Sequence, residues 1–456
     1  MQKQAELGTA PVGKLLTRLA IPAITAQLVN MLYNLVDRVY IGHLPEVGTQ
    51  ALTGVGVCFP IIMLVSAFAA LIYSGGAPRA SIEMGKRNDA EAERILGNCT
   101  ALLICLSIVL TLVLSAWNRP ILLLFGASEA TIPYATQYMN IYALGTIFVQ
   151  LSLGLNAFIT CQGFARTSML TVLIGAVLNT VLDPLLMFVL NMGVQGAALA
   201  TVISQAVSAV WVILFLTGKK TNLRLRTENL RLNFKRLGPC VALGLSPFIM
   251  QSTESLIAVC FNTSLRTYGG DMAVGAMTIL TSIMQFALLP LNGLTQASQP
   301  IISYNYGAQN PARVRAAFKL LLRCCLTYTA VLWLTVQLFP GMYIGMFTPD
   351  TALRAYTIPY LRIYMSGTVV FGIQIGCQQT FVSIGNAKNS LFLAVLRKIL
   401  LLIPLIYVLP ALLPDKVTAV FLAEPVADVI AVTVTSLMFR SRFGAAMRAM
   451  EAKQHA

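Results

Sequence analysis

Residues 169–190 read MLTVLIGAVLNTVLDPLLMFVL, and Asp183 is the only ionisable side chain in this run. A helix needs about 20 apolar residues to cross a bilayer, so the run is long enough to span a membrane. Similar stretches recur along the 456 residues, of which 57% are hydrophobic and only 11% are charged. Soluble domains carry about 25% charged residues. The composition therefore predicts an all-α polytopic membrane protein, because a spanning helix satisfies its own backbone hydrogen bonds in lipid.

Apolar run length and the positions of Pro, Gly and charged residues predict twelve spans. Their approximate bounds are 15–41, 51–73, 95–117, 132–160, 168–190, 195–217, 238–266, 274–303, 315–339, 354–382, 390–411 and 417–439. If the N-terminus is cytoplasmic, the 32 Lys and Arg residues lie on the cytoplasmic side except for six, which are Arg38, Arg119, Arg266, Arg354, Arg362 and Lys416. This asymmetry follows the positive-inside rule. It predicts a multi-pass protein of the cell (inner) membrane with both termini in the cytoplasm, and it explains the net charge of +15 without a nucleic-acid partner.

The chain repeats itself at an offset of 222 residues, without a gap from about residue 48 to residue 168. EMGKRNDAEA at 83–92 thus corresponds to NYGAQNPARV at 305–314. An even number of spans per repeat gives both halves the same orientation, so a pseudo-two-fold axis along the membrane normal should relate two six-helix bundles.

The repeat divides the chain into an N-lobe at 1–217, a basic cytoplasmic linker at 218–237 and a C-lobe at 238–456. A cleft between two such bundles suits alternating access by rigid-body motion.

Four polar residues of the first half have apolar counterparts in the second half. Asp37, Asn179, Asp183 and Thr201 align with Val259, Leu401, Leu405 and Ala423. At a rise of about 1.5 Å per residue, the two aspartates and the threonine lie roughly 6–11 Å below the outer ends of their spans, so they can share one level. Their oxygen atoms would bind Na⁺, or the carboxylates would carry protons, because desolvation and mutual repulsion favour protonation. Hydrogen bonding between helices is the structural alternative.

Two helices carry polar stripes that cannot face lipid. Gln27, Asn30, Asn34 and Asp37 are spaced three, four and three residues apart in span one, and span six carries Thr201, Ser204, Gln205 and Ser208. These stripes should line the interior of the first bundle. Pro184 removes a backbone donor, so it should break the helix locally beside Asp183.

Further acidic and amide groups lie in the second half. Glu254 is near the middle of span seven, where it would pair with a cationic substrate or carry a proton, and Gln374 and Gln378 in span ten would face it. For Glu424 and Asp428, four residues apart in span twelve, interhelical hydrogen bonding is the simplest expectation. Nine cysteines and two histidines show neither a disulfide framework nor the spacing of a metal site.

The strings NLVDRVYIGHL at 34–44, QGFARTS at 162–168 and NTVLDPLLMF at 179–188 resemble transporters of the multidrug and toxic compound extrusion (MATE) family, of the bacterial drug-efflux type and the MOP superfamily. The resemblance covers nearly the whole chain. It implies that Asp37, Asn179, Asp183 and Thr201 form the N-lobe cation site, and that Pro22 is a hinge. It also implies that Asn156 and the polar residues from Gln27 to Asn34 face the substrate cavity.

The resemblance also matches Glu254 to an acidic residue in branches that couple through the C-lobe. Those branches have an aspartate in span ten, where this chain has Gln374 and Gln378. This difference favours coupling in the N-lobe.

We therefore expect a monomeric secondary antiporter that exports organic cations in exchange for H⁺ or Na⁺ and needs no other cofactor. A flippase for lipid-linked precursors is one alternative, and it should have a strongly basic central cavity. A channel is another alternative, although the carboxylates form no obvious symmetric ring. An enzyme is not expected, since the sequence shows no nucleophile, histidine base or metal cluster.

Overall fold

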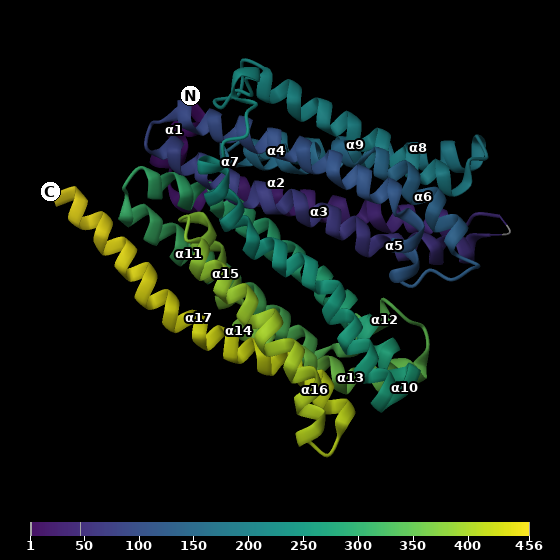
Figure 1. The fold of residues 1–456 in the computed structure, drawn as a ribbon. Helices are drawn as coiled ribbons and strands as arrows, with labels where there is room; N and C mark the ends of the chain where they lie inside the picture. The colour runs from purple at the N-terminus through teal and green to yellow at the C-terminus, as the bar shows by residue number, and fades with distance from the viewer. Residues whose placement is uncertain (1, 46, 456) are drawn as a thin grey trace.

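The computed structural model describes residues 2–45 and 47–455, and every regular element in these residues is a helix. Two bundles meet at the end of the molecule that carries both chain termini, here called the termini end, and they diverge toward the opposite end (Figure 1). The structure confirms the predicted all-α fold with two bundles.

The first bundle follows the short helix α1 (Gln2–Thr9). It consists of α2 (Val12–Gly42), α3 (Gly48–Gly85), α4 (Asp89–Ala116), α5 (Asn118–Leu124), α6 (Ile132–Leu144), α7 (Thr146–Cys161), α8 (Ala165–Pro184) with the π-helical turn η1 (Leu185–Val189), and α9 (Gly193–Thr217). A connection that includes the 3₁₀ turn η2 (Thr227–Asn229) leads to the second bundle.

The second bundle repeats this plan. It consists of α10 (Phe234–Gly307), α11 (Pro311–Leu338), α12 (Pro340–Gly345), α13 (Thr351–Tyr364), α14 (Thr368–Ser383), α15 (Ala387–Val395) with the π-helical segment η3 (Leu396–Leu402) and α16 (Ile403–Leu412), and α17 (Lys416–His455).

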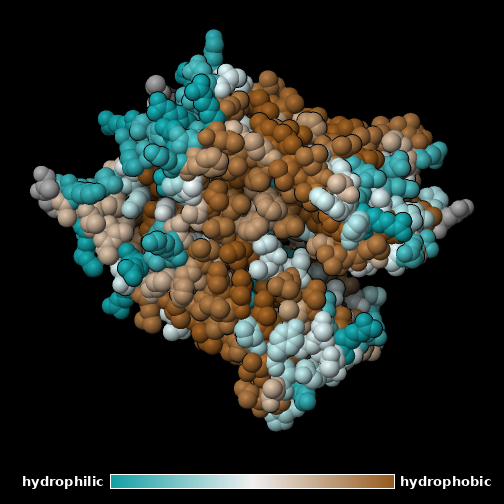
Figure 2. All heavy atoms as spheres, viewed as in Figure 1, coloured by the Kyte–Doolittle hydropathy of each residue, from teal (hydrophilic) through white to brown (hydrophobic). Residues whose placement is uncertain are grey.

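The spans follow from helix length and hydropathy. Within the described residues, nine helices are long and apolar enough to cross a membrane, and α6 with α7 forms a further span bent by 57°. The long helix α10 holds two spans because Gly270, at φ 66°, interrupts it. The helices α13 and α14 occupy the repeat positions of α6 and α7 and complete the twelve. A broad hydrophobic region separates hydrophilic surfaces at the two ends of the molecule (Figure 2).

Several helices are longer than the predicted spans. Helix α3 ends at Gly85, whereas the sequence predicted a span that ends near residue 73. Pro78 lies inside α3 and does not end it. Prolines are tolerated within membrane helices, because neighbouring groups satisfy the freed carbonyl. The additional turns carry the contact between the two bundles.

The bundles touch at the termini end through glycines of α3 and α10. A Cβ atom on Gly75 would overlap the carbonyl oxygen of Cys240, and a Cβ atom on Gly244 would overlap that of Leu71. Only glycine allows the two backbones to approach this closely. Further along the same helices, the rings of Phe68 and Phe248 pack with their centroids 5.2 Å apart.

Helix α2 packs against both bundles. Its first turns, with Leu15, Leu16 and Leu19, belong to the same apolar core as Phe381 of α14. Pro22 is buried, and Ile24 beyond it still lies against Gly293 of α10, while α2 also packs against α8 of its own bundle. Pro22 therefore lies within the part of α2 that contacts the second bundle.

Candidate functional site

The predicted N-lobe residues lie on α2, α8 and α9. Asn179 and Asp183 are one helical turn apart on α8, and both are buried. The chain leaves α-helical geometry directly after Pro184 and forms the π-helical turn η1. The predicted local break therefore occurs, and it lies immediately beyond Asp183.

Three of the four predicted cation-site residues are joined by hydrogen bonds. The Nδ2 atom of Asn179 donates to Oδ1 of Asp183 at 3.3 Å and to Oγ1 of Thr201 at 3.4 Å. The Thr201 hydroxyl in turn donates to the carbonyl oxygen of Ala197 at 3.1 Å. The side chain of Asn179 thus connects α8 to α9 and fixes the orientation of the Asp183 carboxyl.

Asp37 of α2 completes this group. Its carboxyl interacts electrostatically with the Asp183 carboxyl. Two tyrosines interact electrostatically with the acids: Tyr33 with both aspartates, and Tyr138 of α6 with Asp37. Neither tyrosine was predicted from the sequence, although Tyr33 precedes Asp37 by one helical turn and was detectable from that spacing.

Several buried oxygen atoms of this group accept no hydrogen bond from the described part of the chain. They are Oδ1 of Asp37, Oδ1 of Asn179 and Oδ2 of Asp183. Buried polar atoms are usually paired, and an unpaired one costs about 1–3 kcal/mol. Oxygen atoms are the preferred ligands of hard cations, and a carboxyl oxygen also accepts a proton. The donor set therefore fits either Na⁺ or H⁺.

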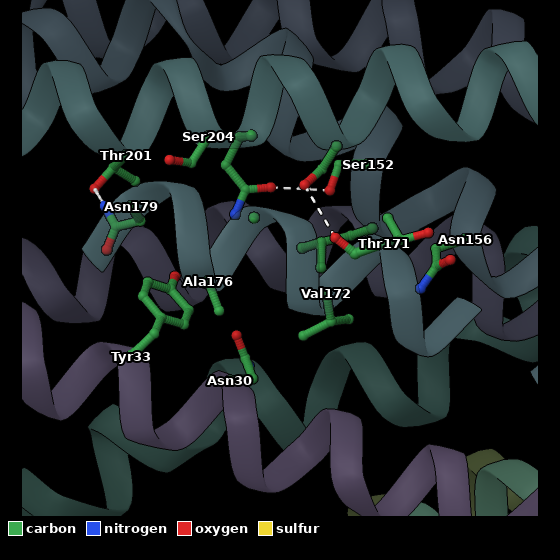
Figure 3. Close-up of a pocket in the computed structure, with 14 residues that line it drawn as sticks. Asn30, Tyr33, Ser152, Asn156, Thr171, Val172, Ala176, Asn179, Thr201 and Ser204 are labelled. Atoms are coloured by element: carbon green, nitrogen blue, oxygen red, sulfur yellow. Dashed lines mark hydrogen bonds between the residues drawn. The ribbon is translucent and has the colours of Figure 1, made fainter. Parts of the chain in front are cut away.

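A cavity of about 50 Å³ adjoins the group between α2, α7, α8 and α9 (Figure 3). Asn30, Tyr33, Asn156, Asn179 and Thr201 line it, together with Ser152, Leu153, Thr171, Val172, Gly175, Ala176, Ser204, Gln205 and Ser208. Drug-sized ligands occupy about 300–1,000 Å³. The cavity therefore has room for an ion with a few water molecules and not for an organic cation.

The cavity wall is itself partly bonded. Ser152 donates to Oε1 of Gln205 at 2.9 Å, and Ser208 donates to the carbonyl oxygen of Thr171 at 3.2 Å. The structure thus places Asn30, Asn156 and Gln205, three of the predicted cavity residues, around one polar space.

The remaining predicted cavity residues lie elsewhere. Gln27 and Asn34 are half-buried on α2 outside the set that lines this cavity, and Asn34 donates to the carbonyl oxygen of Asn30 at 2.6 Å. In the second bundle, Gln378 donates to Oγ of Ser246 at 3.0 Å, and Gln374 accepts a hydrogen bond from Thr435.

The partner of Glu254 is a lysine rather than either glutamine. Lys398 Nζ lies 2.5 Å from Oε1 of Glu254. Its neighbour Arg397 donates through Nε to Asp428 at 2.7 Å and through Nη2 to Glu424 at 2.8 Å. The expectation that Glu424 and Asp428 bond between helices is therefore confirmed, with Arg397 of η3 as the partner.

Arg397 and Lys398 do not lie with the cytoplasmic charges, so the side predicted for them from the positive-inside rule was wrong. Both side chains are buried inside the second bundle. They are accommodated there because three carboxylates neutralise them. The repeat offset could have revealed them, since Arg397 aligns with Gly175 and Lys398 aligns with Ala176, both in the first-bundle cavity wall.

The fold is shared with solved transporter structures. The chain superposes on a MATE protein in its bent conformation with a TM-score of 0.92, at 22% identity and with 99% of each chain covered. It superposes on the outward-facing conformation of a multidrug resistance MATE family transporter of the MOP superfamily with a TM-score of 0.90, at 23% identity, covering 97% of this chain and 98% of that one.

The sequence is also similar to a curated relative. The multidrug export protein MepA of Staphylococcus haemolyticus (strain JCSC1435) is 23% identical over 423 residues, which is 92% of each chain. The sequence profile of the MatE family matches residues 22–185 and 247–408, one segment in each bundle. With twelve spans in two bundles and this match over most of both, the chain belongs to the MatE family of membrane transporters.

Proposed function

We propose that this protein is a secondary active multidrug antiporter that exports organic cations in exchange for H⁺ or Na⁺. The relative named above is a multidrug export protein, and the two-bundle fold suits alternating access between two facing lobes. In this proposal residues 1–217 form the N-lobe, residues 218–237 the cytoplasmic linker and residues 238–456 the C-lobe. The termini end faces the cytoplasm of a monomeric cell-membrane protein, and Pro22 is the hinge of α2.

The observation that carries the proposal is the arrangement around Asp183. A buried carboxylate next to a second carboxyl, with unpaired oxygen atoms and an ion-sized cavity, is costly unless a positive charge joins it. An ionisable group at such depth in a membrane protein usually belongs to an ion pathway. Asp37, Asn179, Asp183 and Thr201 are the residues that would hold the coupling ion.

Both candidate ions fit this donor set. Na⁺ would take oxygen atoms from all four side chains, whereas H⁺ would be shared by the two adjacent carboxyl groups. Either ion would remove the repulsion between Asp37 and Asp183 and so favour one arrangement of α2 against α8. Coupling requires only that the ion and the drug bias the same two-state equilibrium in opposite directions.

The test is uptake of a fluorescent organic cation into vesicles that contain the purified protein. A pH gradient and a Na⁺ gradient are imposed separately. Asp183→Asn should abolish the response to the productive gradient, whereas Asp271→Asn, at an exposed position of α10, is the matched control. Gradient-driven transport by Asp183→Asn at the wild-type rate would refute the assigned role. Ionic current without coupling to either gradient would support a channel instead.

A further inference from the structure

In the ion pair between Lys398 and Glu254, only the Glu254 side chain is exposed at the surface of the protein. The Lys398 side chain is 7% exposed, whereas the Glu254 side chain is 61% exposed. In the ion pairs of Arg397 with Glu424 and Asp428, both partners are buried, since no side chain is more than 6% exposed. Arg397 is therefore held inside the bundle, whereas the carboxylate of Glu254 is accessible from outside it.

Glu254 lies on α10 beyond the turns that pack on α3. The first half of α10 packs on α3 through Cys240 and Gly244, and the last ring contact is that of Phe248 with Phe68. Glu254 lies six residues beyond Phe248 on the same helix. Because a carboxylate this exposed is costly in lipid, we infer that Glu254 faces water between the bundles.

The charges of this group do not balance. Arg397 and Lys398 face three carboxylates, those of Glu254, Glu424 and Asp428, which leaves one negative charge in excess when all are ionised. The Tyr364 hydroxyl lies among the same charges. Lys398 also interacts electrostatically with Glu424, so its ammonium group has a second acidic neighbour.

The two bundles use equivalent positions in different ways. Gly175 and Ala176 leave room in the first bundle for a cavity, whereas Arg397 and Lys398 occupy the corresponding positions in the second. The second bundle thus carries two positive side chains at the positions that line a cavity in the first bundle. Phe371 supports them, since its ring centroid lies 4.4 Å from the Arg397 guanidinium.

We propose that Lys398 is a tethered cation, which occupies Glu254 until the positive group of a monovalent organic cation displaces it. This inference rests on the proposed function. A bound monovalent cation neutralises the excess charge, and the displaced Lys398 ammonium moves toward Glu424. Neutral and anionic compounds gain nothing from this exchange, so the site selects for one positive charge.

The test is equilibrium binding of ethidium to the purified full-length protein, followed by fluorescence anisotropy without any ion gradient. Removing the competing charge in Lys398→Met should tighten binding roughly fivefold, which corresponds to about 1 kcal/mol, the upper range for a partly exposed ion pair. Glu254→Gln should weaken binding by a similar factor. Adding Lys398→Met to Glu254→Gln should then have no further effect. Lys388→Met, at an exposed position of α15, is the matched control.

A purely structural ion pair gives a different result. Lys398→Met would then bind ethidium as the wild type does or more weakly, and either outcome overturns the inference. If Lys398→Met does not fold, Glu254→Gln decides alone, because unchanged binding in that variant also overturns it. If the variants change ethidium binding as expected but the protein shows no gradient-driven exchange, only the antiport proposal is refuted. If exchange occurs but Lys398→Met does not tighten ethidium binding, only this inference is refuted.

Discussion

Gly85 of α3 lies against the carbonyl oxygen of Tyr304 of α10, so closely that a Cβ atom on Gly85 would overlap that oxygen. The pseudo-symmetric contact is also present, because Gly307 lies in the same way against the carbonyl oxygen of Ile82. The offset of 222 residues exchanges the two pairs. The repeat in the sequence is therefore a repeat in space, and its axis passes between α3 and α10 at the termini end.

Gly85→Ala should weaken this contact. The added methyl group meets backbone atoms that cannot turn away, so we expect a loss of about 1–3 kcal/mol, typical of overpacking. The melting temperature of the purified protein should fall, and the buried Cys240 at the same interface should react faster with a maleimide. Gly56→Ala is the control, since its Cβ atom would meet nothing within 4 Å. Equal melting temperatures for the two variants would contradict the close contact.

Thr201→Ala should distinguish the two coupling ions. The substitution installs the residue that the repeat has at position 423, and it removes one oxygen from the proposed site. Na⁺ loses a ligand, so Na⁺-driven uptake in vesicles should fall roughly tenfold, a factor that corresponds to about 1.4 kcal/mol. A proton resides on the carboxyl groups, so uptake driven by a pH gradient should change less than about twofold. A tenfold fall under both gradients would show that Thr201 serves mainly to hold the fold.

Arg397→Met should destabilise the second bundle. Glu424 and Asp428 would remain buried without their cation, and breaking a buried ion pair on one side costs about 3–5 kcal/mol. The triple variant Arg397→Met, Glu424→Gln, Asp428→Asn should recover most of the loss, because no uncompensated charge remains. Thermal unfolding in detergent measures both variants. A triple variant no more stable than Arg397→Met would argue that packing on Phe371 matters more than charge.

Pro22→Ala should affect motion more than binding. Alanine restores a backbone donor within the part of α2 that contacts the second bundle, which stiffens the helix. We expect exchange in vesicles to slow roughly tenfold, because a stiffer hinge would raise the barrier to the conformational change by about 1.4 kcal/mol. Ethidium binding at equilibrium should stay within about twofold of the wild type. If binding weakens in parallel with exchange, Pro22 shapes the substrate site and is not a hinge.

Much of the architecture was predictable from the sequence, because each span must satisfy its backbone within itself and must be long enough for the bilayer. The twelve spans and the two bundles follow from hydropathy and the 222-residue offset, whereas the family was indicated by the resemblance of three short strings, one of which contains Asp183. The association of Asn179, Asp183 and Thr201 was also within reach, since a spacing of four residues places two of them on one face and the rise per residue gives their depth. Their role in coupling remains a prediction.

The partners of Glu254, Glu424 and Asp428 were not predictable in this way. Lys398 and Glu254 are separated by 144 residues, and their contact depends on how η3 is rotated toward α10. Sequence periodicity indicates which residues share a face of one helix, but it does not give the rotation of one helix against another. The sequence by itself determined the spans, the repeat and the four polar residues particular to the first half. Only the tertiary structure decided which charges meet, because packing sets helix rotation and thereby places Arg397 and Lys398 among the buried carboxylates.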